Sequence, residues 1–373
     1  MNPNPAPAPD DQPDIFTAYG SNAFRLPLRQ WAWVLAFAVV FVVLTPLLWP
    51  RLEKLEPAAD FRMNYDLSND YWLYERAAKM AAERCDTMLI GDSVVWGQYV
   101  KRDQTLSHYL NELAGRERVA NLGLDGAHPV ALAGLIEYYA SAVANKNVIL
   151  FCNPLWMSSP QRDLQTAEEF RFNHAKLVPQ FSPWIPCYKE NVAARLGNVV
   201  DRNFAFNGWT GHLQTVYFDK SDIPGWTLEH PYASPLSAVT LELPKDADTL
   251  RHDPVPWTTH GAQKQDFAFV PLETSLQWRA FQRAIEILKS RGNRIAVVIV
   301  PLNEHMMTEP SRLACAKNRA DIDTALRAQK IECFAAPVLL SEMYADTSHP
   351  LSDGYRLQAK QIVEKQILAE DKK

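Results

Sequence analysis

The 373-residue chain lacks several patterns that identify common classes of site. It has five cysteines but no C-x-x-C pair, which argues against a structural zinc site. It has no G-x-G-x-x-G and no Walker sequence, so nothing indicates a nucleotide cofactor, and we expect no cofactor. The net charge of -5 and a pI near 6.0 argue against a nucleic-acid partner. No repeat of 20–50 residues indicates a solenoid.

The cysteines do not identify the redox compartment. Their number is odd, so at least one stays unpaired within the chain. A bridge between Cys315 and Cys333 is compatible with the sequence, but spacing alone does not establish it. The remaining cysteines are Cys85, Cys152 and Cys187.

One long hydrophobic run is present at residues 31–50, without a charged residue and with tryptophans near both ends. Its length matches the roughly 20 residues that a helix needs to cross a bilayer. It follows a proline-rich tail, residues 1–30, that we expect to be disordered. The alternatives are a cleaved signal peptide and a buried core helix. We favour a single membrane anchor, because no Ala-x-Ala site follows and the run is apolar all round.

The charges that flank this run do not set its orientation. Arg25 and Arg29 precede it, whereas Arg51, Lys54 and Arg62 follow it. The positive-inside rule therefore gives no clear direction, and its slight bias opposes an exported domain.

The rest of the chain predicts an α/β domain. Short apolar runs alternate with helical patterns, which is typical of a parallel sheet covered on both faces. We expect a flavodoxin-like three-layer α/β/α fold with five parallel strands. The expected strands are 87–90, 119–123, 147–152, 294–300 and 331–334, and the expected helices are 71–84, 106–114, 130–143, 276–291, 311–329 and 352–368.

This alternation is interrupted once. Residues 155–272 are rich in proline and aromatic residues and show no steady strand–helix pattern, apart from a helical stretch near 189–202. So long a departure is more typical of a lid or binding element than of a bare loop. The expected organisation is a linker at 51–70, an α/β domain of 71–154 and 273–373, and an insertion or lid at 155–272.

Polar residues follow successive strands at what should be one edge of the sheet. Ser93 lies in a Gly-Asp-Ser turn after the first strand, Gly126 follows the second, and Asn153 follows the third. Asp346 and His349 precede the last helix. A weak serine nucleophile needs a base and oxyanion donors, and these residue types supply both. Alone, each has an ordinary reading as a turn, cap or loop residue.

Together, these blocks resemble the SGNH, or GDSL-type, hydrolase superfamily over residues 86–368 outside the insertion. The matching blocks are Gly91-Asp92-Ser93, Asn121-x-Gly123-x-x-Gly126 and Asp346-x-x-His349. The third block departs from the family's Gly-x-Asn-Asp, because here it reads Phe151-Cys152-Asn153-Pro154. The resemblance implies that Ser93 is the nucleophile, His349 the base and Asp346 its orienting acid. It also implies an oxyanion hole of the Ser93 and Gly126 amides with the Asn153 side chain.

The membrane-anchored architecture with a long insertion is similar to proteins that O-acylate exported polysaccharides, as in alginate acetylation and teichoic-acid D-alanylation. This likeness implies a single-pass protein of the bacterial inner membrane with its catalytic domain in the periplasm. It implies a glycan substrate and a multi-spanning membrane acyltransferase as partner. The expected activity is transfer or hydrolysis of O-acyl groups, chiefly O-acetyl groups. The alternatives are a non-catalytic binding partner and a lipid esterase.

Four further residues are candidates to line the substrate cleft. Trp96 and Trp156 follow two of the catalytic blocks and could bind a sugar face, although core packing explains them equally well. His128 and His305 lie at the ends of expected strands and could face the cleft, or could be ordinary polar loop residues. No spacing among them indicates a metal site.

Overall fold

The computed structural model describes residues 26–57, 60–168, 172–244, 250, 252–261 and 263–367. Residues 1–25 of the expected disordered tail lie outside this range. The chain divides into two units, residues 1–49 and 50–373, which are described separately. The first contains most of helix α1 (Leu28–Leu52), which extends the expected helix at both ends.

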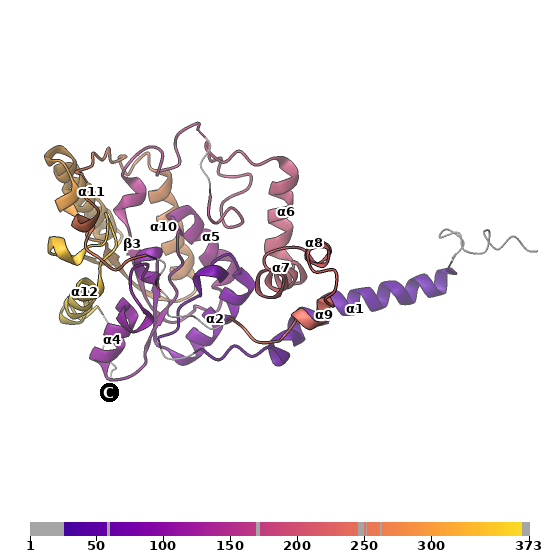
Figure 1. Cartoon of the computed structure of the whole chain (residues 1–373). Coiled ribbons are helices and arrows are strands. Elements are labelled where there is room, and N and C mark those ends of the chain that lie inside the picture. Colours follow the sequence, from indigo (N-terminus) through magenta and orange to yellow (C-terminus); the bar gives the residue numbers. More distant parts are fainter. Residues whose placement is uncertain are drawn as a thin grey trace, which may run out of the picture. The chain divides into compact units, whose positions relative to one another are not determined.

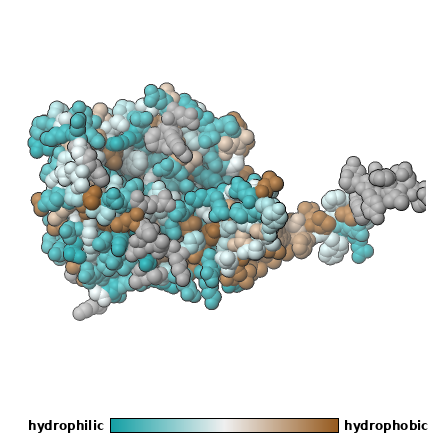
Figure 2. Space-filling model, in the orientation of Figure 1, coloured by the Kyte–Doolittle hydropathy of each residue, from teal (hydrophilic) through white to brown (hydrophobic). Residues whose placement is uncertain are grey.

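Helix α1 is apolar and its side chains are mostly exposed, so it is not a core helix (Figure 2). In the described part of the chain it alone is long and apolar enough to cross a membrane. These properties suit either a membrane anchor or a signal sequence.

The second unit contains the expected five-stranded parallel sheet, with strand order β2-β1-β3-β4-β5 (Figure 1). All five strands were expected from the sequence, and two of them match at both ends. The strands are β1 (Thr87–Ile90), β2 (Val119–Asn121), β3 (Asn147–Cys152), β4 (Arg294–Ile299) and β5 (Glu332–Ala335). Because all strands run in one direction, the segments that follow them meet at the same edge of the sheet.

Helices cover both faces of this sheet, which confirms the three-layer fold. One face packs against α2 (Tyr71–Arg84), α5 (Pro129–Tyr139), α10 (Leu276–Ser290) and α11 (Glu309–Ala328). The other face packs against α4 (Leu106–Ala114) and α12 (Ser352–Glu364).

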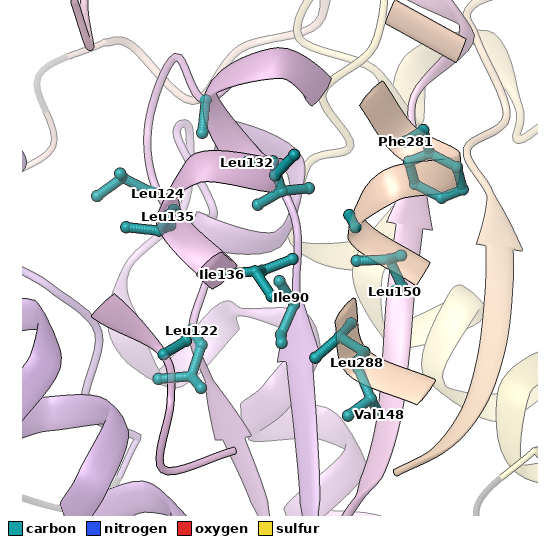
Figure 3. Close-up of a cluster of buried hydrophobic side chains, with 14 of the residues drawn as sticks. Ile90, Leu122, Leu124, Leu132, Leu135, Ile136, Val148, Leu150, Phe281 and Leu288 are labelled. Atoms are coloured by element: carbon teal, nitrogen blue, oxygen red, sulfur yellow. The ribbon is translucent and has the colours of Figure 1, made fainter. Parts of the chain in front are cut away.

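On the first face of the sheet, alternate strand residues pack against helices α5 and α10 (Figure 3). Ile90 and Leu150 point from adjacent strands toward Leu132 of α5 and Phe281 of α10, and all four are buried. The alternate strand residues, such as Leu89, belong to the core of the opposite face. Since both faces are apolar, each strand reads as a continuous hydrophobic run.

The insertion is largely helical, beyond the single helical stretch that the sequence indicated. That stretch is α6 (Val192–Asn203), and it is followed by α7 (Ala205–Tyr217), α8 (Ile223–Glu229) and α9 (Pro235–Ala238). The insertion ends beside its own beginning, where the Val270 amide donates to the Met157 carbonyl.

A buried charge cluster joins the residue after α1 to the insertion. His212 of α7 lies between two carboxylates, with its Nε2 2.8 Å from Glu53 Oε2 and its Nδ1 2.6 Å from Asp70 Oδ2. The Tyr217 hydroxyl and the Arg76 guanidinium also donate to Glu53. Burial lowers the pKa of His212, but the two carboxylates outweigh burial and raise it to about 9. The imidazolium therefore holds residue 53, helix α2 and helix α7 together.

Candidate active site

Ser93 is presented by a tight turn between β1 and the short helix α3 (Ser93–Trp96). A Cβ at Gly91 would lie 2.5 Å from a side chain of that helix, so the turn needs glycine. Asp92 caps the helix, because its Oδ1 accepts from the Val94 amide at 3.0 Å. The strand and its cap thus hold Ser93 at the carboxyl edge of the sheet, where it is 7% exposed.

The structure brings Ser93, His349 and Asp346 together from opposite ends of the domain's sequence. His349 Nε2 lies 2.8 Å from Ser93 Oγ, and His349 Nδ1 lies 2.7 Å from Asp346 Oδ2. Asp346 Oδ1 also accepts from the backbone amides of Ser348 and His349 at 2.9 Å each. With Nδ1–H donating to the carboxylate, Nε2 is free to accept the Ser93 proton.

The electrostatics of this triad favour a strong base. Burial lowers the pKa of His349, but the nearby Asp346 charge outweighs burial, and the net shift is upward. Burial raises the pKa of Asp346, but His349 and the backbone amides outweigh it and lower the pKa to about 2. Asp346 is therefore ionised at neutral pH and stabilises an imidazolium at His349.

Asn153 lies at the same edge, clamped by Asp92. Its Nδ2 donates to Asp92 Oδ2 at 2.8 Å, and its Oδ1 accepts from the Leu155 amide at 3.1 Å. The indole nitrogen of Trp156 donates to the same Asp92 oxygen at 2.8 Å. The amide group of Asn153 carries a second hydrogen, so this clamp leaves one donor for a ligand. Sequence reasoning missed this role of Asp92, although Asp92 lies within the Gly-Asp-Ser block.

The loop that carries Gly126 is held beside the same turn. The Leu124 amide donates to the Gly91 carbonyl at 3.1 Å, which continues the pairing of β2 with β1. Gly126 has a φ of +69°, a left-handed conformation that favours glycine. A Cβ there would also lie 2.5 Å from the Asn173 side chain of the insertion. Gly126 thus lies where the insertion meets the edge of the sheet.

The two candidate tryptophans occupy different environments. Trp96 is buried, donates its indole hydrogen to the Met63 carbonyl at 2.7 Å, and lies under the Arg62 guanidinium. It therefore packs inside the domain and offers little ring surface to a sugar. Trp156 is half-buried and bonds to Asp92, so it borders the triad.

The two candidate histidines lie outside the triad, but the His128 ring packs edge-on against Trp156, with 5.7 Å between ring centroids. His128 is 2% exposed and caps α5, where its Nδ1 accepts from the Ala131 amide at 3.4 Å. Burial lowers its pKa to about 3, which keeps it neutral. His305 is exposed and donates from Nε2 to the Leu339 carbonyl at 3.1 Å.

Tyr99 and His252 lie beside the triad, and no motif in the sequence indicates either residue. The centroid of the Tyr99 ring lies 5.5 Å from that of the His349 ring and 5.1 Å from that of the His252 ring. Burial and the Asp346 carboxylate raise the pKa of Tyr99 to about 12. His252 belongs to the insertion, whose Trp257 amide bonds to a carbonyl near Asp346. The insertion therefore reaches the triad.

Within the described residues, no three His, Cys, Asp or Glu side chains gather where they could hold a metal ion. All five cysteines are free thiols, so Cys315 and Cys333 are not bridged. No known protein family matches the chain, and no curated protein matches it either.

Proposed function

We propose that this protein is an SGNH-type serine enzyme that transfers or removes O-acyl groups, chiefly acetyl groups, on an exported or cell-wall polysaccharide. The observation that carries the proposal is the contact of 2.8 Å between His349 Nε2 and Ser93 Oγ, with Asp346 bonded to the other imidazole nitrogen. In this arrangement Ser93 serves as the nucleophile, His349 as its base and Asp346 as the acid that orients the imidazole.

In the first half of the reaction, Ser93 Oγ attacks the carbonyl carbon of an acyl ester. Its proton moves to His349 Nε2, and Asp346 stabilises the resulting imidazolium. Negative charge develops on the carbonyl oxygen, where the Ser93 and Gly126 amides and the free Asn153 hydrogen would donate. The tetrahedral intermediate then expels the alkoxide, which takes the proton from His349, and leaves an acyl group on Ser93.

In the second half, a hydroxyl group attacks the acyl-serine. His349 removes its proton and then returns a proton to Ser93 Oγ as the ester bond to the enzyme breaks. A sugar hydroxyl as acceptor gives transfer, whereas water gives hydrolysis. The approach of the insertion to the triad, through His252, supports transfer, because a covered site limits the access of water.

The proposed location rests on helix α1, which we take as a single membrane anchor of the bacterial inner membrane with the body in the periplasm. Its length and exposed apolar surface support an anchor. A multi-spanning acyltransferase that carries acyl groups across the membrane is the proposed partner. Reporter fusions or protease mapping that put residues beyond 60 in the cytoplasm would refute this location.

A fluorophosphonate probe tests the proposed chemistry, because it reacts with activated serines. We expect the purified full chain to be labelled, and labelling to be lost in Ser93→Ala and His349→Ala. Ser290→Ala is the matched control, since it removes a serine of α10 whose hydroxyl donates to the Ile287 carbonyl and should keep labelling. Absence of labelling in folded protein would favour the alternative, a non-catalytic partner that binds polymer. Turnover of acyl glycerols but not of acetylated glycans would favour a lipid esterase.

A further inference from the structure

A cavity lies away from the triad, between helices α5 and α10 and the insertion. Its volume is about 610 Å³, within the range of small-molecule sites. No residue of the triad lines it. From the insertion, Pro179, Phe181 and Pro183 line it, together with Arg202 of α6.

Each of the two helices lines this cavity with one face. On α5 the lining residues include Val130, Ala133, Gly134 and Glu137, with Tyr138 beside them, and on α10 they are Leu276, Arg279, Ala280 and Arg283. The four residues Val130 to Glu137, and the four residues Leu276 to Arg283, follow i, i+3, i+4, i+7 spacing, which is one face of a helix. The opposite faces carry the large residues that fill the core, such as Leu132 and Phe281 (Figure 3). The alanines are too small to fill the space that the cavity occupies, whereas Gly134 lets the Leu177 backbone pack against α5, where a Cβ would lie 2.0 Å from the Leu177 carbonyl oxygen.

The charge around this apolar space is unbalanced. Three lining residues in the described part of the chain are arginines, and one, Glu137, is a carboxylate. Arg283 has only long contacts, at 3.6 Å to Glu137 and 3.7 Å to Glu286, and its side chain is 55% exposed. The Arg279 guanidinium has no hydrogen-bond or ion-pair partner among the residues that the structure describes. Guanidinium groups in this position match a carboxylate or similar anion.

We propose that this cavity binds a single-chain anionic amphiphile, with its hydrocarbon tail against Val130, Ala133 and Ala280. Its carboxylate head lies between Arg279 and Arg283. The tail is held by burial of apolar surface, and the head by charge-assisted hydrogen bonds. This site is independent of the chemistry proposed for Ser93.

A photoreactive diazirine analogue of oleate tests the site in the full chain, held in amphipol. We expect cross-links to residues 177–185 and to α10, read by peptide mass spectrometry. Ala280→Trp fills the cavity and should abolish them. Arg279→Gln with Arg283→Gln should weaken binding about tenfold or more, because charge-assisted bonds are lost. Unlabelled oleate should compete at least tenfold better than oleyl alcohol, and acetate should not compete.

The matched control is Arg312→Gln with Arg327→Gln, which makes the same change of charge on the exposed side of α11. This control should label like the wild type. Because Arg279 and Arg283 are surface side chains, their variant keeps the proposal testable if Ala280→Trp fails to fold. Cross-links elsewhere, equal competition by oleyl alcohol, or equal loss in both arginine pairs would overturn the proposal.

Discussion

The Asp92 clamp gives a prediction whose magnitude follows from the contacts. Asp92 accepts hydrogen bonds from the Val94 amide, from Asn153 Nδ2 and from Trp156 Nε1. Asp92→Asn keeps the shape but replaces one acceptor oxygen by an amide group. If the remaining oxygen still accepts from the Val94 amide, the Asn153 and Trp156 donors both face the new amide group, which is itself a donor. Each orphaned buried donor costs about 1–3 kcal/mol, so we expect a loss of about 2–6 kcal/mol in the free energy of unfolding.

This change should also lower turnover, because Asn153 loses the bond that orients it. Loss of one oxyanion donor costs on the order of 10²-fold in rate. Trp156→Phe is the control, since it removes one donor and leaves Asn153 clamped, so its cost should be about 1 kcal/mol with little change in rate. Thermal unfolding and hydrolysis of 4-nitrophenyl acetate measure the two effects. An Asp92→Asn variant with wild-type stability and rate would refute the clamp.

Three other predictions follow from local features. Asp346→Asn should cut turnover by about 10³–10⁴-fold. Because the Asp346 charge raises the pKa of His349, this change should move the acid limb of the pH–rate profile to lower pH. An acid limb at the wild-type pH would show that Asp346 does not act on the pKa of the catalytic base. Glu53→Gln should destabilise the body by about 3 kcal/mol in urea titrations. The raised pKa of His212, about 9 against 6.5, means that wild-type stability is lost as pH rises through 9, and a flat profile would contradict this. Gly91→Ala should reduce folded yield, because its Cβ would lie 2.5 Å from a neighbouring side chain; full activity would disprove that crowding.

Much of the sheet was predictable because its strands are buried on both faces. Residues 87–90 and 147–152 are continuous apolar runs bounded by polar turns, and the structure places β1 and β3 at those positions. Helix α2 was equally clear, since Asp70 caps its start and Cys85 begins the approach to the next strand. Such signals are local, so the sequence alone carries them.

The insertion was less predictable for a physical reason. Helix α7 has no clean apolar stripe in its sequence, and its stability comes from partners far along the chain. Its His212 is buried only because Glu53 and Asp70 supply charges on both sides. No pattern within residues 205–217 reveals those partners.

The candidate active site also combines residues that local sequence signals predict with residues that only long-range contacts bring into place. Ser93, Asp346 and His349 could be proposed from short blocks, because each block follows a strand or precedes a helix. The positions of Tyr99 and His252 beside the triad could not be predicted in this way. Tyr99 contacts His252, 153 positions further along the chain, and also His349, and no motif indicates either contact. Similarly, the clamp on Asn153 depends on Asp92, which is distant in sequence but adjacent across the paired strands β1 and β3.

The most direct test of the central claim is the mass of the peptide that contains Ser93 after reaction with an acyl donor. The full chain would be mixed with 4-nitrophenyl acetate, quenched in acid within a turnover and digested. The account predicts one acetyl group on Ser93 in the wild type and none at this position in Ser93→Ala or His349→Ala. An active enzyme that never carries an acyl group on Ser93 would contradict it.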